Sequence, residues 1–446
     1  MTQQMITKQD RQQTNQIMKN ILKNFSLLIA FILLSVCVVA QHSFVRVQNG
    51  KFYIGNKPYY FKGMNYWYGG LLATGEKKEQ GKERLKKELD FLSRNGVTNL
   101  RVLVGSEGTG KINGVQRVHP SLQPTQNEYD TALLYGLDYL LSEMNQRNMK
   151  AILFFSNTWE WSGGWLQYLQ WNGKLADSTM RRKLNWDELR DIVSGFFACD
   201  ACKKAYYDKV KFIISRTNTV TGKKYIEDPA IMSWEPINEP RPMRPAVNAL
   251  FLKWASETSA LIRSLDQNHL ITTGCEGDLA LDNNMPLYKS LHADKNIDYL
   301  TIHIWPKNWG WFHDTAIVQG YPTVEKNLSE YLTKHISVAR EMKKPLVVEE
   351  FGLPRDGHSF DIHSSTVYRD KMFKIIFDRW DKSRKKQDVL AGWNVWTFSG
   401  IGRAGKDPLH WTMGDDMLGD PPQEEQGLNS VFDTDKRTWS LIRSYK

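Results

Sequence analysis

Two glutamates that follow buried strand-like runs are the residues of this chain best suited to chemistry. Glu239 closes the segment Trp-Glu-Pro-Ile-Asn-Glu-Pro at residues 234–240, and Glu349 and Glu350 close a second apolar run. A carboxylate at the end of a buried strand is costly unless it has a partner or a task there. Two such carboxylates on separate strand ends are what a retaining glycosidase uses, one as the nucleophile and one as the acid/base.

Each of these motifs holds two glutamates, and spacing decides between them in only one motif. Glu235 lies roughly 13 Å before Glu239 along an extended strand, and Glu239 is the one beside the turn at Pro240. We therefore expect Glu239 to reach the strand end and Glu235 to take no part in the chemistry. Glu349 and Glu350 are neighbours, whose side chains face opposite ways in a regular strand, so periodicity does not choose between them.

Strand-like apolar runs alternate with helical segments along the chain. The eight strand-like runs cover residues 61–68, 97–104, 150–156, 231–238, 270–275, 299–305, 346–351 and 392–398. Helical segments are expected at 81–95, 129–148, 203–217, 247–266, 287–296, 324–342, 365–384 and 436–445. Continuous apolar runs are typical of parallel strands that are covered on both faces.

This alternation predicts an α/β fold, a (β/α)8 TIM barrel preceded by a β-hairpin at residues 44–60. Long βα loops are expected at 105–128, 159–202 and 399–429, and loops of that length usually carry function. A doubly wound open sheet is the alternative. It would require a Gly-rich nucleotide-binding turn after the first strand, which residues 63–66 do not provide.

The first 40 residues read as a secretory signal peptide, which leaves residues 41–446 as one catalytic domain. The apolar run 25–40 ends in a small residue and follows several basic side chains. An uncleaved membrane anchor is the alternative, but the run is short for a spanning helix. We therefore predict a secreted, extracellular protein that keeps no membrane association after cleavage, with periplasmic retention or tethering to the cell surface left open.

Composition excludes some partners and favours others. The chain has a formal net charge of +10, spread without a basic block interleaved with aromatics, so nucleic acid is not an expected partner. The 16 Trp and 18 Tyr exceed what a core usually needs, and flat aromatic faces are typical of sugar-binding clefts. Cys199 and Cys202 form either a local disulfide, free thiols or half of a redox or metal site.

In a TIM barrel the active site lies at the C-terminal ends of the strands, so the polar and aromatic residues there are candidates. From the first three strands and their loops these are Asn65, Trp67, Arg101, Asn157, Trp159, Trp161 and Trp165, and from the later ones Asn238, Glu239, His303, Trp305, Glu349, Glu350, Trp393 and Trp396. The tryptophans of the third loop are expected to wall the cleft, with packing as the alternative. No histidine spacing indicates a metal site, and we expect neither a metal nor another cofactor.

Several of these motifs together resemble glycoside hydrolase family 5. They are WEPINEP at 234–240, HIW at 303–305, EEFG at 349–352 and GWNVWTF at 392–398. The segments 216–241 and 420–427 are similar to its endo-β-1,4-mannanase subfamily, subfamily 7. The resemblance covers residues 44–446, essentially the whole domain.

The resemblance implies a role for each of three charged residues. Glu239 matches the general acid/base, Glu350 the nucleophile, and Arg101 the arginine that keeps the nucleophile ionised. The implied two-step mechanism retains the anomeric configuration, with carboxyl groups about 5–5.5 Å apart. We expect a raised pKa at Glu239 and a low pKa at Glu350.

The resemblance also implies sugar contacts. Asn238 matches the amide that binds the 2-hydroxyl, His303 the histidine of the sixth strand, and Trp396 the floor of the subsite left of the scissile bond. Trp305 departs from the family, since many members carry a tyrosine there whose hydroxyl contacts the nucleophile. Trp67, Asn157 and Trp159 complete the predicted substrate-binding set.

These observations predict a monomeric, secreted mannan endo-1,4-β-mannosidase that cleaves internal bonds of mannan, galactomannan and glucomannan. An exo-β-mannosidase or a cellulase on the same barrel is the alternative within enzymes. A non-catalytic polysaccharide-binding protein is the alternative outside them, but such a protein usually lacks one of Glu239 and Glu350, and both are present.

Overall fold

The computed structural model describes residues 44–313 and 315–445, together with Gln13, Gln16, Met18, Lys19, Leu22 and Lys23. The chain divides into two units, and the larger one is made of residues 45–53 and 58–446. The predicted signal peptide therefore lies almost wholly outside the described residues. Among the described residues, no helix has the length and apolar character needed to cross a membrane.

The larger unit is built on eight parallel strands, as the sequence predicts. Every predicted strand is present, each at or within its expected range or shifted by two residues. They are β4 (Phe61–Asn65), β5 (Asn99–Leu103), β8 (Lys150–Phe154), β9 (Ile231–Glu235), β10 (Leu270–Ile271), β11 (Leu300–Ile304), β12 (Leu346–Phe351) and β13 (Leu390–Val395). Strand pairing runs in the order β10-β9-β8-β5-β4-β13-β12-β11.

The two end strands of this order, β10 and β11, are joined by hydrogen bonds from β11 and the segment before it to the end of β10 and the residues after it. Asp298 N donates to Ile271 O at 2.8 Å, and His303 N donates to the carbonyl oxygen of Glu276 at 2.9 Å. The Thr301 hydroxyl also donates to Cys275 O, at 2.9 Å. These bonds close the sheet, and the predicted (β/α)8 barrel is confirmed.

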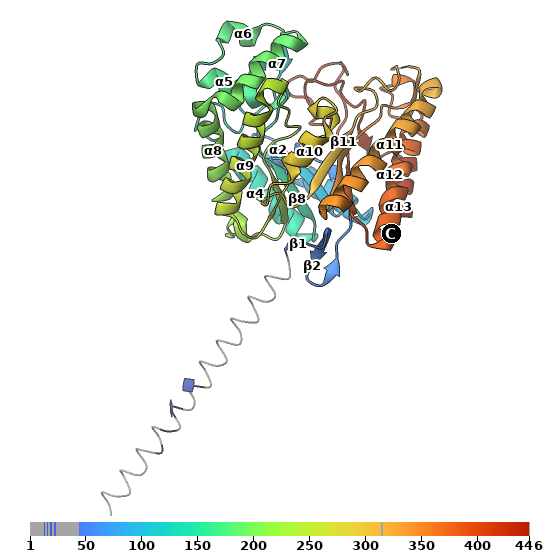
Figure 1. Ribbon diagram of the computed structural model, residues 1–446. Helices are drawn as coiled ribbons and strands as arrows, with labels where there is room; N and C mark the ends of the chain where they lie inside the picture. Colours follow the sequence, from blue (N-terminus) through green and yellow to red (C-terminus); the bar gives the residue numbers. More distant parts are fainter. Residues whose placement is uncertain are drawn as a thin grey trace, which may run out of the picture. The chain divides into compact units, whose positions relative to one another are not determined.

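Helices follow the strands and cover the outside of the barrel (Figure 1). They are α3 (Lys78–Arg94), α4 (Thr131–Gln146), α8 (Asp200–Ile214), α9 (Asn248–Leu265), α10 (Met285–His292), α11 (Ile317–Met342), α12 (Val367–Lys386) and α13 (Lys436–Ser444). In α3, Leu85, Leu89 and Leu92 are buried at helical spacing, whereas Lys86, Lys87 and Asp90 between them are exposed. This apolar stripe fixes which face of the helix packs on the strands.

Short elements complete the description. β1 (Val45–Gln48), β2 (Lys51–Ile54) and β3 (Lys57–Pro58) form the N-terminal sheet, where a hairpin was predicted. The loops contain α2 (Gly69–Leu72), β6 (Lys111–Ile112), β7 (Val115–Gln116), β14 (Phe398–Gly400) and β15 (Val431–Phe432). They also contain the 3-10 helices η3 (Tyr225–Glu227), η4 (Pro245–Val247), η5 (Leu279–Leu281) and η6 (Asp356–His358).

The long loop after β8 is folded into helices that sequence reasoning left as irregular chain. It contains η1 (Glu160–Ser162), α5 (Gly164–Trp171), α6 (Asp177–Arg181), α7 (Trp186–Ser194) and η2 (Gly195–Ala198). A Cys199–Cys202 disulfide ends the loop, so of the three predicted states of these cysteines the local disulfide is the one found.

Trp165 packs inside this folded loop. Its ring stacks on Phe196 with centroids 3.8 Å apart, and the side chain is fully buried. The prediction that Trp165 walls the cleft is therefore wrong, because the loop builds its own aromatic core and buries the indole there.

Candidate active site

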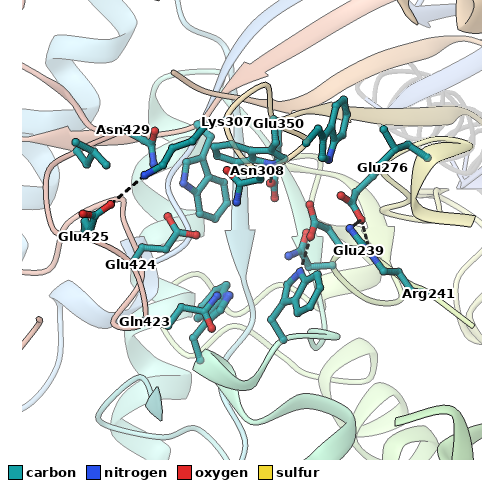
Figure 2. A pocket seen from close by; sticks show the side chains of 18 of the residues that line it. Glu239, Arg241, Glu276, Lys307, Asn308, Glu350, Gln423, Glu424, Glu425 and Asn429 are labelled. Atoms are coloured by element: carbon teal, nitrogen blue, oxygen red, sulfur yellow. Dashed lines mark hydrogen bonds and ion pairs between the residues drawn. The ribbon is translucent and has the colours of Figure 1, made fainter. Parts of the chain in front are cut away.

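A cavity of about 840 Å³ opens at the C-terminal ends of the strands, and both predicted catalytic carboxylates line it (Figure 2). Every side chain around it comes from a strand end or the loop that follows, which is the TIM-barrel arrangement. The lining residues are Trp159, Trp161, Trp186, Asn238, Glu239, Arg241, Glu276, Leu279, Trp305, Lys307, Asn308, Trp309, Glu350, Trp396, Gln423, Glu424, Glu425, Leu428 and Asn429.

Glu239 is held at the tip of β9 in a left-handed backbone conformation, with φ of 54°. Such a conformation is unfavourable for a residue with a Cβ and persists only where the surroundings enforce it. Here Glu239 N donates to Gly274 O at 3.0 Å. Its carboxylate accepts from the indole N–H of Trp159 and lies 2.7 Å from His303 Nδ1. The backbone and two side chains therefore fix where the acid points.

A register shift in β12 places Glu350 in the cleft. Ile302 of β11 pairs with Val348, whereas the next residue, His303, pairs with Glu350, so Glu349 is the extra residue of a β-bulge. Glu349 is completely buried below the cleft, and Asn65 donates to its backbone oxygen at 2.9 Å. The bulge therefore determines that Glu350, and not Glu349, lies in the cleft, which alternation along a regular strand could not predict.

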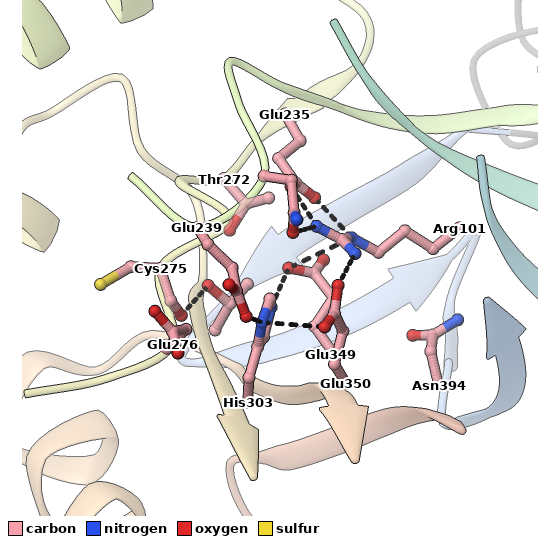
Figure 3. Close-up of polar contacts among 12 residues, drawn as sticks. Arg101, Glu235, Glu239, Thr272, Cys275, Glu276, His303, Glu349, Glu350 and Asn394 are labelled. Atoms are coloured by element: carbon pink, nitrogen blue, oxygen red, sulfur yellow. Dashed lines mark hydrogen bonds and ion pairs between the residues drawn. The ribbon is translucent and has the colours of Figure 1, made fainter. Parts of the chain in front are cut away.

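Arg101 connects the two catalytic strands from beneath. Its Nη1 donates to Glu350 Oε1 at 2.5 Å, and its Nη2 donates to Asn238 Oδ1 at 2.6 Å. Its Nε and Nη2 also form a two-pronged pair with Glu235, at 2.9 and 2.5 Å. Figure 3 shows the guanidinium between Glu235 and Glu350. The planar fork of arginine suits this task, and a lysine could not make the same contacts.

Glu235 lines no part of the cleft, yet its role was missed. A buried strand glutamate must be paired to be stable, and the sequence already showed that need. Its partner is Arg101, so Glu235 holds that guanidinium in place.

Trp305 supplies the hydrogen bond that a tyrosine supplies in many family members. Its indole Nε1 donates to Glu350 Oε2 at 3.2 Å. The ring also packs edge-on against Trp396, with centroids 5.8 Å apart. Glu350 therefore accepts from Arg101 on one oxygen and from Trp305 on the other.

Burial dominates the protonation of the two carboxyls. It raises the pKa of Glu239, as predicted, and Arg241 and the Trp159 N–H oppose the rise. It also raises the pKa of Glu350, against the opposing charge of Arg101. The low pKa expected at Glu350 is therefore wrong, because burial raises the pKa by more than the Arg101 guanidinium lowers it.

His303 is neutral in the site. Burial lowers its pKa well below the usual value, and the charge of Arg101 adds to the effect. Its Nδ1 lies 2.7 Å from Glu239 and 3.3 Å from Glu350, so that nitrogen carries the proton and donates to the pair.

Glu239, His303 and Glu350 offer ligand atoms that all lie within 4.8 Å of one another, and they are also the described residues that could hold a metal ion. The Arg101 guanidinium contacts one of these carboxylates directly, and its positive charge opposes a second cation at the same oxygens. The arrangement fits two carboxyls acting together better than a metal centre.

The predicted sugar-binding residues divide into two groups. Asn238, Trp159, Trp305 and Trp396 line the cavity. Asn157 is buried behind Asn238 and accepts from its Nδ2 at 3.1 Å, so it orients that amide.

His303 and Trp67 do not line the cavity. His303 is fully buried and meets the carboxylates from below. Trp67 is 1% exposed, donates to Gly419 O at 2.6 Å and packs on Trp161. It supports the cleft wall from behind rather than forming part of it.

Charged cleft residues outside the predicted set form two clusters (Figure 2). Arg241 contacts Oε2 of Glu276 through both Nε and Nη2, at 2.7 and 2.5 Å, and burial raises the pKa of Glu276 to about 7. Glu425 bridges Lys307 and His358, at 3.1 and 2.9 Å, and we call this trio the three-loop strap. Arg241 lies two residues after Glu239, so its presence near that carboxylate could have been predicted from the sequence. The three-loop strap could not, because it joins loops that are distant in sequence.

Comparison with known proteins agrees with this geometry. Residues 42–446 match the family model described as GH family 5 beta-mannosidase-like. The chain is 29% identical to mannan endo-1,4-beta-mannosidase 7 of Arabidopsis thaliana, over 79% of this chain and 77% of that protein. It is 28% identical to mannan endo-1,4-beta-mannosidase 1 of Solanum lycopersicum, over 84% and 88% of the two chains.

Among solved structures, a glycoside hydrolase family 5 mannosidase from Rhizomucor miehei superimposes with a TM-score of 0.81 at 30% identity, covering 91% of this chain and 97% of that one. The barrel, the paired carboxylates at its strand ends and these relationships lead to one conclusion: the chain is a glycosidase that belongs to the β-mannosidase-like family of glycoside hydrolase family 5.

Proposed function

We propose that the protein is a retaining endo-β-1,4-mannanase that hydrolyses internal bonds of mannan, galactomannan and glucomannan. The observation that carries the mechanism is the closeness of Glu239 and Glu350, whose nearest ligand oxygens lie within 4.8 Å. Retaining enzymes hold their carboxyl groups about 5–5.5 Å apart, and inverting enzymes need about 6.5–9.5 Å to admit a water. The plant relatives named as mannan endo-1,4-beta-mannosidases support the substrate.

In the first step Glu350 attacks the anomeric carbon while Glu239 protonates the departing oxygen. Burial raises the pKa of both carboxyls, and the direct contact of the Arg101 charge, together with the Trp305 N–H, favours the ionised form of Glu350, so we assign the shared proton to Glu239. In the second step Glu239 removes a proton from water, which attacks the glycosyl-enzyme and releases Glu350. The product keeps the configuration of the substrate.

Carboxylate variants test this assignment. Glu350→Gln is expected to lose activity on mannan and on aryl β-mannosides alike, since no nucleophile remains. Glu239→Gln is expected to lose activity on mannan but to retain the first step on an aryl mannoside with an acidic phenol, whose departure needs no proton. NMR of the first product from wild-type enzyme should show the β-anomer. An α-anomer, or wild-type activity in Glu350→Gln, contradicts the proposal.

An exo-acting β-mannosidase is a second candidate, and the three-loop strap favours it. Lys307, His358 and Glu425 join the loops that follow β11, β12 and β13, the last of which also follows Trp396. Bulk at the Trp396 end of the cleft limits how many sugars fit on that side of the scissile bond. Products from locust-bean gum, carboxymethyl-cellulose and aryl mannoside separate the candidates: a ladder of oligosaccharides supports endo action, mannose alone supports exo action, and cleavage of the cellulose derivative supports a cellulase.

We also propose that the enzyme acts outside the cell, on the basis of the apolar run 25–40 and the basic residues before it. Expression of the full chain followed by N-terminal sequencing of the culture supernatant tests this. A mature N-terminus near residue 41 supports export with cleavage, whereas retention in the membrane fraction supports the uncleaved anchor.

A further inference from the structure

Trp186 presents an exposed indole to the cleft. It is the first residue of α7 and lines the same cavity as Glu239 and Glu350. Its exposed fraction is 48%, and the other cavity-lining tryptophans of the described chain are buried or half-buried. A large aromatic face left in water inside a polar cleft is more consistent with ligand contact than with packing.

The helix that carries Trp186 is fixed at its first turn. Asn185 and Glu188 form a capping box, in which each side chain accepts from the backbone N–H of the other at 3.0 Å. A capping box satisfies two backbone donors that a helix start otherwise leaves open. The indole therefore projects from a rigid position although it lies within a long loop.

The same helix is attached to the segment that follows the acid/base. Arg244 binds Asp191 at 2.6 Å and Asp187 at 3.0 Å, and Arg190 donates to Met243 O at 2.7 Å. Met243 and Arg244 lie just after the turn that positions Glu239. These contacts hold the indole at a set place relative to the catalytic strand end.

Hydrogen bonds show which side of the scissile bond Trp186 faces. Trp159 donates to Glu239, and the Trp186 ring lies 6.2 Å from the Trp159 ring, inclined by 27°. At the other carboxylate, Trp305 donates to Glu350 and packs on Trp396. Since Glu239 protonates the departing oxygen, the Trp159 side faces the leaving group, and Trp186 lies one indole further out.

We propose that Trp186 is the stacking platform of an outer leaving-group subsite, which binds a pyranose ring of a β-1,4-linked mannan chain. This inference rests on the proposed function and extends it to substrate length. A substrate must carry at least two sugars on the leaving side to reach the platform. Trp186 then determines the preference for long chains and leaves the chemical step unchanged, because it contacts neither carboxylate.

Kinetics on substrates of two lengths test the proposal. For Trp186→Ala, the KM for mannopentaose is expected to rise about tenfold, in line with truncation of an aromatic anchor. The kcat/KM for an aryl β-mannobioside, whose leaving group is a single phenol, is expected to stay within about twofold on the same reasoning. Trp186→Phe keeps a flat face and should restore most of the pentaose KM. An unchanged pentaose KM in Trp186→Ala overturns the proposal, as does an equal loss on both substrates.

A control variant and a binding measurement separate this proposal from the proposed function. Val318→Ala removes an exposed apolar side chain of α11 that does not line the cavity, and it should leave both substrates unaffected. Titration of mannopentaose into Glu239→Gln, with and without Trp186→Ala, measures the platform without turnover. If wild-type enzyme cleaves no β-mannoside, the proposed function fails. If it cleaves mannan but the titrations coincide, only the platform fails.

Discussion

The indole N–H of Trp305 lies 3.2 Å from Oε2 of Glu350, on the oxygen that Arg101 does not contact. Glu350 therefore has a guanidinium at one oxygen and a neutral indole donor at the other. An indole is a donor only, whereas a phenol both donates and accepts, so Trp305 favours the ionised carboxylate without offering an alternative proton position.

Trp305→Phe tests this contact. Hydrogen bonds to charged groups contribute about 1.5–3 kcal/mol, so kcat should fall by roughly 10- to 150-fold. The N–H stabilises ionised Glu350, so its loss raises the pKa of Glu350 and moves the acidic limb of kcat/KM to higher pH. A pH profile on an aryl β-mannoside measures both effects. A lower kcat with an unmoved acidic limb would indicate that Trp305 acts only by packing on Trp396.

Arg101→Lys should damage both activity and stability. A lysine ammonium cannot contact Glu235, Glu350 and Asn238 together, so at least one buried carboxylate loses its counter-charge. The pKa of Glu350 then rises further, and the acidic limb of kcat/KM shifts to higher pH. Thermal unfolding and a pH profile check the two effects. An unchanged acidic limb would contradict the role of Arg101 as the group that keeps Glu350 ionised.

Arg241→Gln should move the alkaline limb of the pH profile. Arg241 opposes the rise in the pKa of Glu239, so removing its charge raises that pKa. In the proposed mechanism Glu239 acts as the acid in its protonated form, and the alkaline limb therefore shifts to higher pH. Arg340→Gln is the matched control, since Arg340 pairs with Asp388 at the surface. A shift to lower pH in Arg241→Gln would refute the assignment.

Lys209→Met should destabilise the fold rather than the chemistry. Lys209 and Glu107 form a fully buried pair at 2.7 Å, which ties α8 to the loop after β5. Removing one partner of a buried pair costs about 3–5 kcal/mol, because it leaves the other charge uncompensated.

Adding Glu107→Gln to Lys209→Met should recover much of that loss in urea unfolding, since no unpaired charge remains. Lys204→Met removes the exposed partner of Asp208 and is the control, with little measurable change expected. Equal losses of unfolding free energy in the single and double variants would show that the pair contributes by packing and not by charge.

The sequence by itself determined the barrel and its catalytic strand ends. Each of the eight strands is a continuous apolar run, and such runs are favourable only where both faces are covered, so pattern and fold agree. Glu239 could be chosen over Glu235 because only one of them stands beside the turn. Helices inside the long loop after β8 could not be predicted, since contacts within that loop stabilise them.

The tertiary structure decided three points that depend on neighbouring strands. The β-bulge opposite His303 turns Glu350 into the cleft and leaves Glu349 beneath it. The alternation of residues within one strand does not predict that shift. Trp165 is buried and Trp186 is exposed, although both lie in the same loop. Burial by many segments together raises the pKa of Glu350, and the arginine that the motif identifies opposes that rise.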